Sequence, residues 1–224
     1  MSVGLAVNES EDLRELCPSG VVSAVCFGDP DVLPEHPAEA ASCANFQESR
    51  RIEFLNGRLC ARTALAEIGS EDALLSADPL GVPQWPSGFV GSISHSKGLC
   101  GAIAAREKNY FCLGLDYEKI GRLSGTASKR VVHSLEEPLL KSNVHSPTLL
   151  FSLKEAFYKA QFPKWQQRAN FQDIALSLDF KSGTAEIIYL NDAFVSDIVD
   201  AVSKFKFSFT HNNERVCSIC CLPN

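Results

Sequence analysis

The order of sequence patterns is the feature that most restricts how this 224-residue chain can fold. Apolar residues recur at three- and four-residue spacing over residues 38–69, which predicts a helix that stops at Gly69. A second helix is predicted over 151–162, ended by Pro163. Each helix is followed by short apolar stretches that predict antiparallel strands, at 91–95, 99–105 and 110–116 after the first and at 174–180, 184–190, 205–211 and 216–222 after the second.

This repeated order predicts an α+β fold made of two lobes. We place the lobes at residues 1–115 and 116–224, each a helix packed on a small antiparallel sheet. The three strands between the two helices are predicted to form one meander.

Charge and composition exclude several classes of protein. The net charge of −6, from 21 basic and 27 acidic residues, argues against a protein that binds nucleic acid or an anionic membrane over its whole surface. No stretch is apolar enough to span a bilayer, and no signal peptide is recognisable. Nine cysteines without a secretion signal indicate reduced thiols and a cytoplasmic protein. The trio Cys217, Cys220 and Cys221 offers one ligand pair where structural zinc sites use two, so zinc is disfavoured.

The segment 151–160, FSLKEAFYKA, admits two interpretations. Ser152 and Glu155 have the spacing of a capping box, and Glu155 and Lys159 that of a helical ion pair, so the segment could be purely structural. Alternatively, Lys154, Glu155 and Lys159 crowd one helix start, where free N–H groups favour phosphate and a glutamate can hold a divalent metal.

Two strand ends carry further candidate groups. Asp116 and Glu118 point to the same side of a strand, which suits an oxygen-ligated Mg²⁺ but is also common at a solvent boundary. Ser94 and His95 could bind phosphate, or His95 could be an ordinary histidine at a turn. Arg51, Arg58 and Arg62 are spaced to share one face of the first helix.

Together these segments resemble the two-lobed, surfactin-type 4′-phosphopantetheinyl transferases. Phe151 stands where many members of that family carry Trp. The resemblance lies in blocks that match in order: GRLCARTAL at 57–65, GVPQWP at 81–86 with GSISHS at 91–96, LGLDYE at 113–118 and FSLKEAFYK at 151–159.

The resemblance implies a pseudo-dimer of two α+β lobes with the active site in the cleft between them. It implies a Mg²⁺-dependent transfer of 4′-phosphopantetheine from coenzyme A to a serine of an acyl or peptidyl carrier protein by a monomeric enzyme. Metal ligands would be Asp116, Glu118 and Glu155. Catalytic groups would be Glu155, as the base for the serine hydroxyl, and Lys159, at the α-phosphate. The coenzyme A site would comprise Arg51, Arg58, Arg62, Gly81, Val82, Pro83, Ser94, His95, Lys154 and Lys159.

The chemistry agrees with this assignment, because breaking a diphosphate calls for a hard cation together with basic side chains. Two alternatives remain open: a coenzyme A- or carrier-binding module without catalysis, and an unrelated Mg²⁺-dependent phosphodiesterase or nuclease. For the carrier, Lys164 and Arg168 with the nearby aromatic residues are either a docking surface or ordinary loop and core residues.

Overall fold

The computed structural model describes residues 7–8, 11–28, 32–70, 73–96, 98–123 and 125–224. The chain folds into two compact units, Met1–Asn109 and Tyr110–Asn224. Each unit is an antiparallel sheet with helices, so the predicted α+β class is confirmed. The division falls six residues before the predicted one because the whole of strand β5 (Tyr110–Lys119) pairs inside the second unit.

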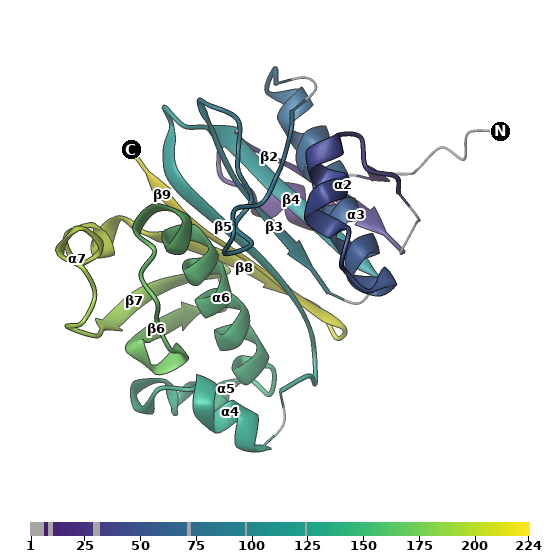
Figure 1. Cartoon of the computed structure of the whole chain (residues 1–224). Coiled ribbons are helices and arrows are strands. Elements are labelled where there is room, and N and C mark those ends of the chain that lie inside the picture. Colours follow the sequence, from purple (N-terminus) through teal and green to yellow (C-terminus); the bar gives the residue numbers. More distant parts are fainter. Residues whose placement is uncertain (1–6, 9–10, 29–31, 71–72, 97, 124) are drawn as a thin grey trace. The chain divides into compact units, whose positions relative to one another are not determined.

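The N-terminal unit is built on a four-stranded sheet of order β1-β2-β4-β3 (Figure 1). Its long helix α3 packs against the sheet, with Leu55, Ala61 and Leu65 buried in the contact. The elements described in this unit are β1 (Val7–Asn8), α1 (Glu11–Leu16), β2 (Val21–Phe27), α2 (Pro37–Cys43), α3 (Glu48–Glu67), β3 (Phe89–His95) and β4 (Leu99–Arg106).

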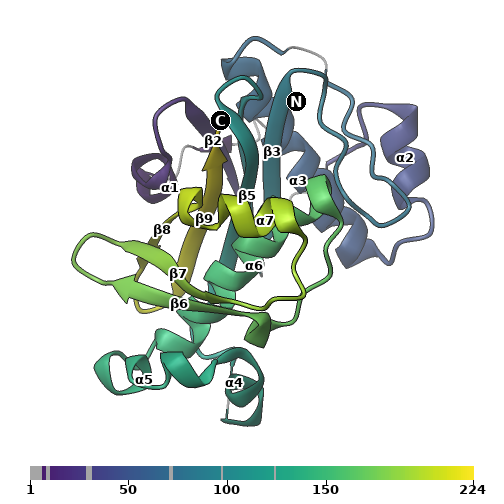
Figure 2. The same cartoon turned by 90° about the vertical axis from the view of Figure 1, so that its left-hand side faces the viewer.

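The C-terminal unit is built on a five-stranded antiparallel sheet of order β5-β9-β8-β7-β6, with helix α6 across it (Figures 1 and 2). Short helices precede α6, and another joins β7 to β8. After β5 the elements are α4 (Gly125–Val131), the 3₁₀ turn η1 (Ser134–Glu136), α5 (Leu139–Ser142), α6 (Ser146–Trp165), η2 (Phe171–Asp173), β6 (Ile174–Asp179), β7 (Thr184–Leu190), α7 (Ser196–Ala201), η3 (Val202–Lys204), β8 (Lys206–His211) and β9 (Arg215–Pro223).

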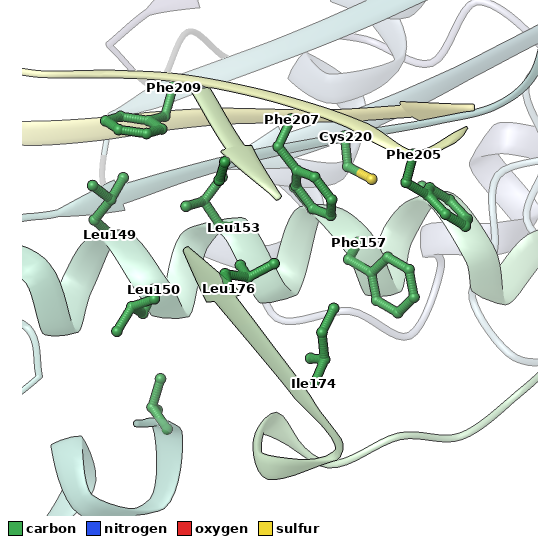
Figure 3. Packing of buried hydrophobic residues seen from close by; sticks show 14 of the residues in the cluster. Leu149, Leu150, Leu153, Phe157, Ile174, Leu176, Phe205, Phe207, Phe209 and Cys220 are labelled. Atoms are coloured by element: carbon green, nitrogen blue, oxygen red, sulfur yellow. The ribbon is translucent and has the colours of Figure 1, made fainter. Parts of the chain in front are cut away.

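The core of the C-terminal unit lies between α6 and the sheet (Figure 3). Leu149, Leu153 and Phe157 follow one another at four-residue spacing along α6 and face aromatic residues of the sheet and of the segment before it. Phe157 packs edge-to-face on Phe205 at a centroid separation of 5.1 Å. This apolar stripe fixes the rotation of α6, and with it the direction of its polar residues.

Gly114 lets β5 approach α6 at backbone distance. A Cβ atom at this position would collide with the carbonyl oxygen of Ala156 and lie 2.8 Å from the backbone nitrogen of Ala160. Glycine is therefore required here by the close approach of two backbones. The contact brings the strand that carries Asp116 against the helix turn that carries Glu155 and Lys159.

Two predicted elements are corrected by the structure. The predicted helix over 38–69 is two helices, α2 and α3, separated by residues 44–47, although Gly69 does follow its end with a φ of +77°. The predicted three-stranded meander is wrong, because β5 leaves β3 and β4 and pairs with β9. The four later strands are confirmed to within one residue at each end.

Helix α6 also differs from its prediction at both ends. It begins five residues earlier, at Ser146, because Pro147 suits the first turn of a helix, and it passes through Pro163 to Trp165. Ser152 therefore does not cap a helix, and its hydroxyl donates to the Asp116 carbonyl oxygen at 3.4 Å. Glu155 lies in the middle of α6 and is therefore not beside the free N–H groups of a helix start.

All nine cysteines are free thiols, and eight of them are buried. Burial raises the pKa of the Cys60 thiol beyond the usual range and that of Cys112 to about 12, so these thiols remain protonated at neutral pH. No helix in the described part of the chain has the length and apolar character needed to cross a membrane.

The contact at Gly114 yields a stability prediction. Gly114→Ala should cost about 3 kcal/mol or more, or prevent folding, because neither backbone can yield without moving β5 or α6. Gly121→Ala is the matched control: φ is +82° but nothing lies within 4 Å, so only backbone strain of about 1–2 kcal/mol is expected. Urea unfolding of both variants measures the difference, and equal losses would contradict the close-packing argument.

Candidate active site

The candidate acidic group of the C-terminal unit starts from two carboxylates on β5. Asp116 and Glu118 are two residues apart, so both project from the face of the sheet that α6 covers. Both are almost fully buried. Lys159 of α6 reaches across and donates its ammonium group to Asp116 Oδ1 at 2.6 Å. Lys159 therefore forms its ion pair with Asp116 on β5, and not the predicted ion pair with Glu155 within the helix.

Glu118 has a separate cation. The Nη1 atom of Arg122 donates to both Glu118 carboxylate oxygens, at 2.8 and 3.0 Å. Burial raises the pKa of Glu118, and the neighbouring Asp116 carboxylate raises it further, while the bond from Arg122 opposes the shift. Arg122 itself is largely exposed, so this bond lies at the border between the acidic group and the solvent.

Glu155 completes the acidic group from the α6 side. Burial raises its pKa, and the Asp116 carboxylate raises it again, while Lys159 lowers it. Three carboxylates therefore interact electrostatically with one another, and two cations, Lys159 and Arg122, only partly compensate them.

This donor set fits a hard divalent cation. Carboxylate oxygens are the ligands that Mg²⁺ prefers, and the mutual repulsion of Asp116, Glu118 and Glu155 would be relieved by a cation. The side chains are not arranged as a finished metal centre: within the described ranges, no three His, Cys, Asp or Glu side chains are grouped closely enough to share an ion. Asp116 and Glu118 are instead bonded to Lys159 and Arg122.

Lys154 does not belong to this group. Its ammonium group is buried and makes three bonds, to Glu136 Oε2 at 2.8 Å and to the carbonyl oxygens of Val131 and Phe171 at 2.9 and 2.8 Å. All three ammonium donors are used inside the protein. The structure therefore places Lys154 in the interior of the C-terminal unit, where it joins α6 to η1 and η2, and does not support its predicted role at phosphate.

The candidate basic group of the N-terminal unit is centred on His95, at the end of β3. Arg50 of α3 donates Nη1 to His95 Nε2 at 2.6 Å and to Glu53 Oε2 at 3.1 Å. Because a guanidinium only donates, Nε2 must accept, and the ring proton lies on Nδ1, 3.5 Å from Glu53 Oε2. The exposed side chains of His95 and Arg50 thus lie together, with Glu53 fixing the orientation of both.

Arg58 lies on the same helix, α3, as Arg50, but its side chain is buried. Its guanidinium stacks over the Phe54 ring at 3.9 Å and donates Nε to the Leu75 carbonyl oxygen at 3.0 Å. Burial lowers the pKa of Arg58 to about 10, so it remains charged at neutral pH. Its Nη2 atom has no hydrogen-bond partner among the described residues, which leaves a charged donor unsatisfied.

Arg62 is occupied by two carboxylates of its own unit. It donates to Glu39 Oε1 at 2.5 Å and to Glu35 Oε1 at 2.9 Å. Because Glu39 belongs to α2 and is fully buried, the bond to Glu39 fastens α2 to α3, and the bond to Glu35 holds the segment before α2. The structure shows Arg62 in these two ion pairs, and its role at the nucleotide stays a prediction.

The remaining predicted residues are distributed around this unit. Ser94 is buried and precedes the exposed His95, so strand alternation directs the two side chains to opposite faces of the sheet. Arg51 is half-buried, and it is Arg50 that reaches His95. Gly81, Val82 and Pro83 form a tight turn around Asp78, whose Oδ1 accepts from the backbone nitrogens of Leu80 and Val82 at 2.8 and 2.9 Å.

Sequence reasoning missed two residues that the structure connects to these groups. Arg50 was passed over because Arg51, Arg58 and Arg62 have the seven- and four-residue spacing of one helix face, and Arg50 lies about 100° around the helix from Arg51. The spacing of Arg50 and Glu53 as an i,i+3 pair was the available signal. Arg122 was missed because it follows a strand, where no spacing rule connects it with Glu118.

Comparison with known proteins gives the class of the fold and site. Residues 38–105 match the family described as "4′-phosphopantetheinyl transferase N-terminal domain", and residues 112–220 match the "4′-phosphopantetheinyl transferase superfamily". The chain belongs to the 4′-phosphopantetheinyl transferases, as its motifs predicted, and is a transferase of that family.

Three characterised relatives carry the same name. The chain is 34% identical to 4′-phosphopantetheinyl transferase Npt of Nocardia iowensis over 78% of this chain and 80% of that protein. It is 36% identical to Svp of Streptomyces mobaraensis, over 77% and 74% of the two chains, and 32% identical to PptT of Mycobacterium tuberculosis, over 71% and 72%. Family membership overturns the alternative of an unrelated phosphodiesterase or nuclease.

The interior position of Lys154 yields a prediction that separates its two roles. Lys154→Met should lower the free energy of unfolding by about 3–5 kcal/mol, because Glu136 is left as an unpaired buried charge. Lys154→Met with Glu136→Gln should cost less than Lys154→Met alone, since no charge then lacks a partner. Urea unfolding measures both. A Lys154→Met protein of normal stability but with a raised coenzyme A KM would show that Lys154 contacts phosphate after all.

Proposed function

We propose that the protein transfers 4′-phosphopantetheine from coenzyme A to a serine of an acyl or peptidyl carrier domain, with Mg²⁺ as the cofactor, and releases 3′,5′-ADP. The observation that carries the proposal is the group of three electrostatically coupled carboxylates, Asp116, Glu118 and Glu155, with Lys159 bonded into it. Membership of the transferase family supports the reaction class.

The basic group of the N-terminal unit would bind the nucleotide end of coenzyme A. Arg50 presents a charged donor beside His95 on an exposed surface, and Arg58 keeps one unsatisfied donor on the same helix. Phosphate oxygens would satisfy these donors. The turn at Gly81–Pro83 would lie against the adenine, as the family resemblance implies.

The acidic group of the C-terminal unit would act at the diphosphate. Asp116, Glu118 and Glu155 would hold Mg²⁺, which supplies positive charge to the phosphate oxygens as negative charge develops on them. Lys159 would move its ammonium group from Asp116 to the α-phosphate, a charge-assisted bond of similar kind.

Glu155 is proposed as the base for the carrier serine. Its raised pKa makes the carboxylate a better proton acceptor than an exposed glutamate. The serine oxygen forms a bond to the phosphorus that bears pantetheine, and the bond from that phosphorus to the 3′,5′-ADP oxygen breaks. The serine proton passes to Glu155 directly or through a water molecule.

A requirement for both carboxylates tests the acidic group. Asp116→Asn and Glu155→Gln should each reduce release of 3′,5′-ADP by about 10²-fold or more in the presence of Mg²⁺ and an apo-carrier domain, because a metal ligand or a base is lost. Far-ultraviolet circular dichroism and the unfolding midpoint serve as controls for the fold. Wild-type turnover in either variant at saturating Mg²⁺ would show that the residue is not part of the site. A wild-type protein that binds coenzyme A but never releases 3′,5′-ADP would favour the binding module without catalysis.

A pair of neighbouring arginines tests the basic group. Arg50→Ala should raise the KM for coenzyme A about tenfold or more, since a charge-assisted bond to phosphate contributes about 1.5–3 kcal/mol. Arg51→Ala, one residue along the same helix, is the matched control and should change that KM less than twofold. Steady-state kinetics at fixed carrier concentration measure both. A larger effect at Arg51 would restore the interpretation made from the sequence.

A further inference from the structure

The docking surface predicted from the sequence is largely occupied by packing within the C-terminal unit. Lys164 lies over the Phe111 ring at 5.0 Å, and Trp165 packs on Phe111 at 5.1 Å and on Phe205 at 6.3 Å. Phe171 packs on Phe151 at 5.0 Å. These aromatic residues extend the core at the C-terminal end of α6, so they are poorly placed to supply the apolar part of a carrier interface.

The segment of residues 119–145 runs from the last residue of β5 to the residue before α6 and has a surface of a different kind; the structure describes all of it except residue 124. Figures 1 and 2 show its helices α4 and α5 together beside the end of α6 where that helix begins. Val131, Val132 and Glu136 point inward and are buried, and Lys154 binds both the Val131 carbonyl oxygen and Glu136. These contacts anchor residues 131–136 to α6 from the inner side and leave the neighbouring basic and apolar side chains outward.

The charge of this segment is opposite to that of the whole protein. It contains five basic and two acidic residues, a formal charge of +3, in a chain whose net charge is −6. Glu136 is buried against Lys154, so Glu137 is the acidic residue of the segment that remains exposed. The basic side chains are all exposed: Lys119, Arg122, Lys129, Arg130 and Lys141.

Large apolar side chains are exposed in the same segment. Leu135 is 53% exposed, Leu140 40% and Val144 83%. Exposed apolar residues among basic ones are typical of a protein interface, in which the apolar contacts give affinity and the charges give orientation and association rate.

The segment also begins at the acidic group. Arg122 binds Glu118 with one side of its guanidinium while remaining 63% exposed. A partner that docks on residues 119–145 would therefore reach the protein beside the carboxylates proposed to act on the serine.

We propose that the outward side of residues 119–145 is the surface on which the carrier domain docks, a partner with an acidic surface and an apolar patch around its serine. The inference rests on the proposed function, because it names the partner surface of that same site. Lys129, Arg130 and Lys141 attract the acidic face of the carrier, and Leu135 and Leu140 contact its apolar patch. A positive surface is needed here because the net charge of the protein repels an acidic partner at long range.

Charge reversal tests the electrostatic part. Lys129→Glu with Arg130→Glu should weaken binding of an apo-carrier domain, its acceptor serine replaced by alanine, about fivefold or more at low salt, with the difference shrinking as salt rises. Binding is measured by surface plasmon resonance without coenzyme A. The matched control is Lys204→Glu with Lys206→Glu, which makes the same change in net charge at exposed lysines. These lysines adjoin Phe205, which packs on Trp165 at the other end of α6.

The apolar part of the proposed docking surface is expected to show a different salt dependence. Leu135→Ser should also weaken carrier binding, but equally at low and high salt, because the lost contact is not screened. Neither the Lys129→Glu, Arg130→Glu protein nor Leu135→Ser should alter the Kd for coenzyme A, measured separately by calorimetry. The unfolding midpoints show whether each variant keeps its fold.

The outcomes separate this inference from the proposed function. If the wild-type protein modifies a carrier and the Lys129→Glu, Arg130→Glu protein binds it no more weakly than the lysine control, the surface is wrong and the function stands. A wild-type protein that neither binds nor modifies a carrier overturns both. Loss of coenzyme A binding in the surface variants would also overturn the inference, because the segment would then belong to the nucleotide site.

Discussion

The approach of β5 to α6 at Gly114 is the contact on which the candidate active site depends. Only a residue without a side chain allows the β5 backbone to lie against the carbonyl oxygen of Ala156. Asp116 follows Gly114 by two residues on the same face of β5, and Glu155 precedes Ala156 on α6. Two carboxylates from distant parts of the sequence thus lie close together. Burial raises the pKa of Glu155, and the neighbouring Asp116 carboxylate raises it further.

Buried charged groups in the C-terminal unit are compensated to two different degrees. Glu136 and Lys154 satisfy each other and the surrounding backbone completely, so this pair joins α6 to the short helical turns and has no capacity left for a ligand. Asp116, Glu118 and Glu155 are less fully compensated, with Lys159 half-exposed and Arg122 open to solvent. This contrast between a fully bonded pair and a partly compensated group separates the charges with a structural role from the charges that we propose act on the substrate.

The sequence was sufficient for the class of fold, for the strands of the second half and for the family. Local patterns of apolar residues determine those features, and the motif blocks lie in the same order as in the transferase family. Prediction from the sequence failed where a contact depends on a residue far away in the chain. The pairing of β5 with β9, the interior bonds of Lys154 and the carboxylate partners of Arg62 depend on residues that are 17 to more than 100 positions away.

The same reason explains where the structure groups the candidate site residues differently from the sequence. Ser94 and His95 were grouped because they are neighbours in sequence, yet neighbours on a strand face opposite ways. Arg50 was missed because the contact that distinguishes it is with His95, 45 residues further along the chain. The acidic residues that the structure brings together were predicted from local signals: the i,i+2 spacing of Asp116 and Glu118 on a strand, and the lysines that flank Glu155 in its own helix.

Intact-mass spectrometry of an apo-carrier domain, incubated with the protein, coenzyme A and Mg²⁺, tests the central claim most directly. The account predicts a mass increase equal to one 4′-phosphopantetheine group, located by fragmentation on a single serine and absent when Mg²⁺ is chelated. A carrier that keeps its original mass in the presence of all components, across acyl and peptidyl carrier domains, would contradict it.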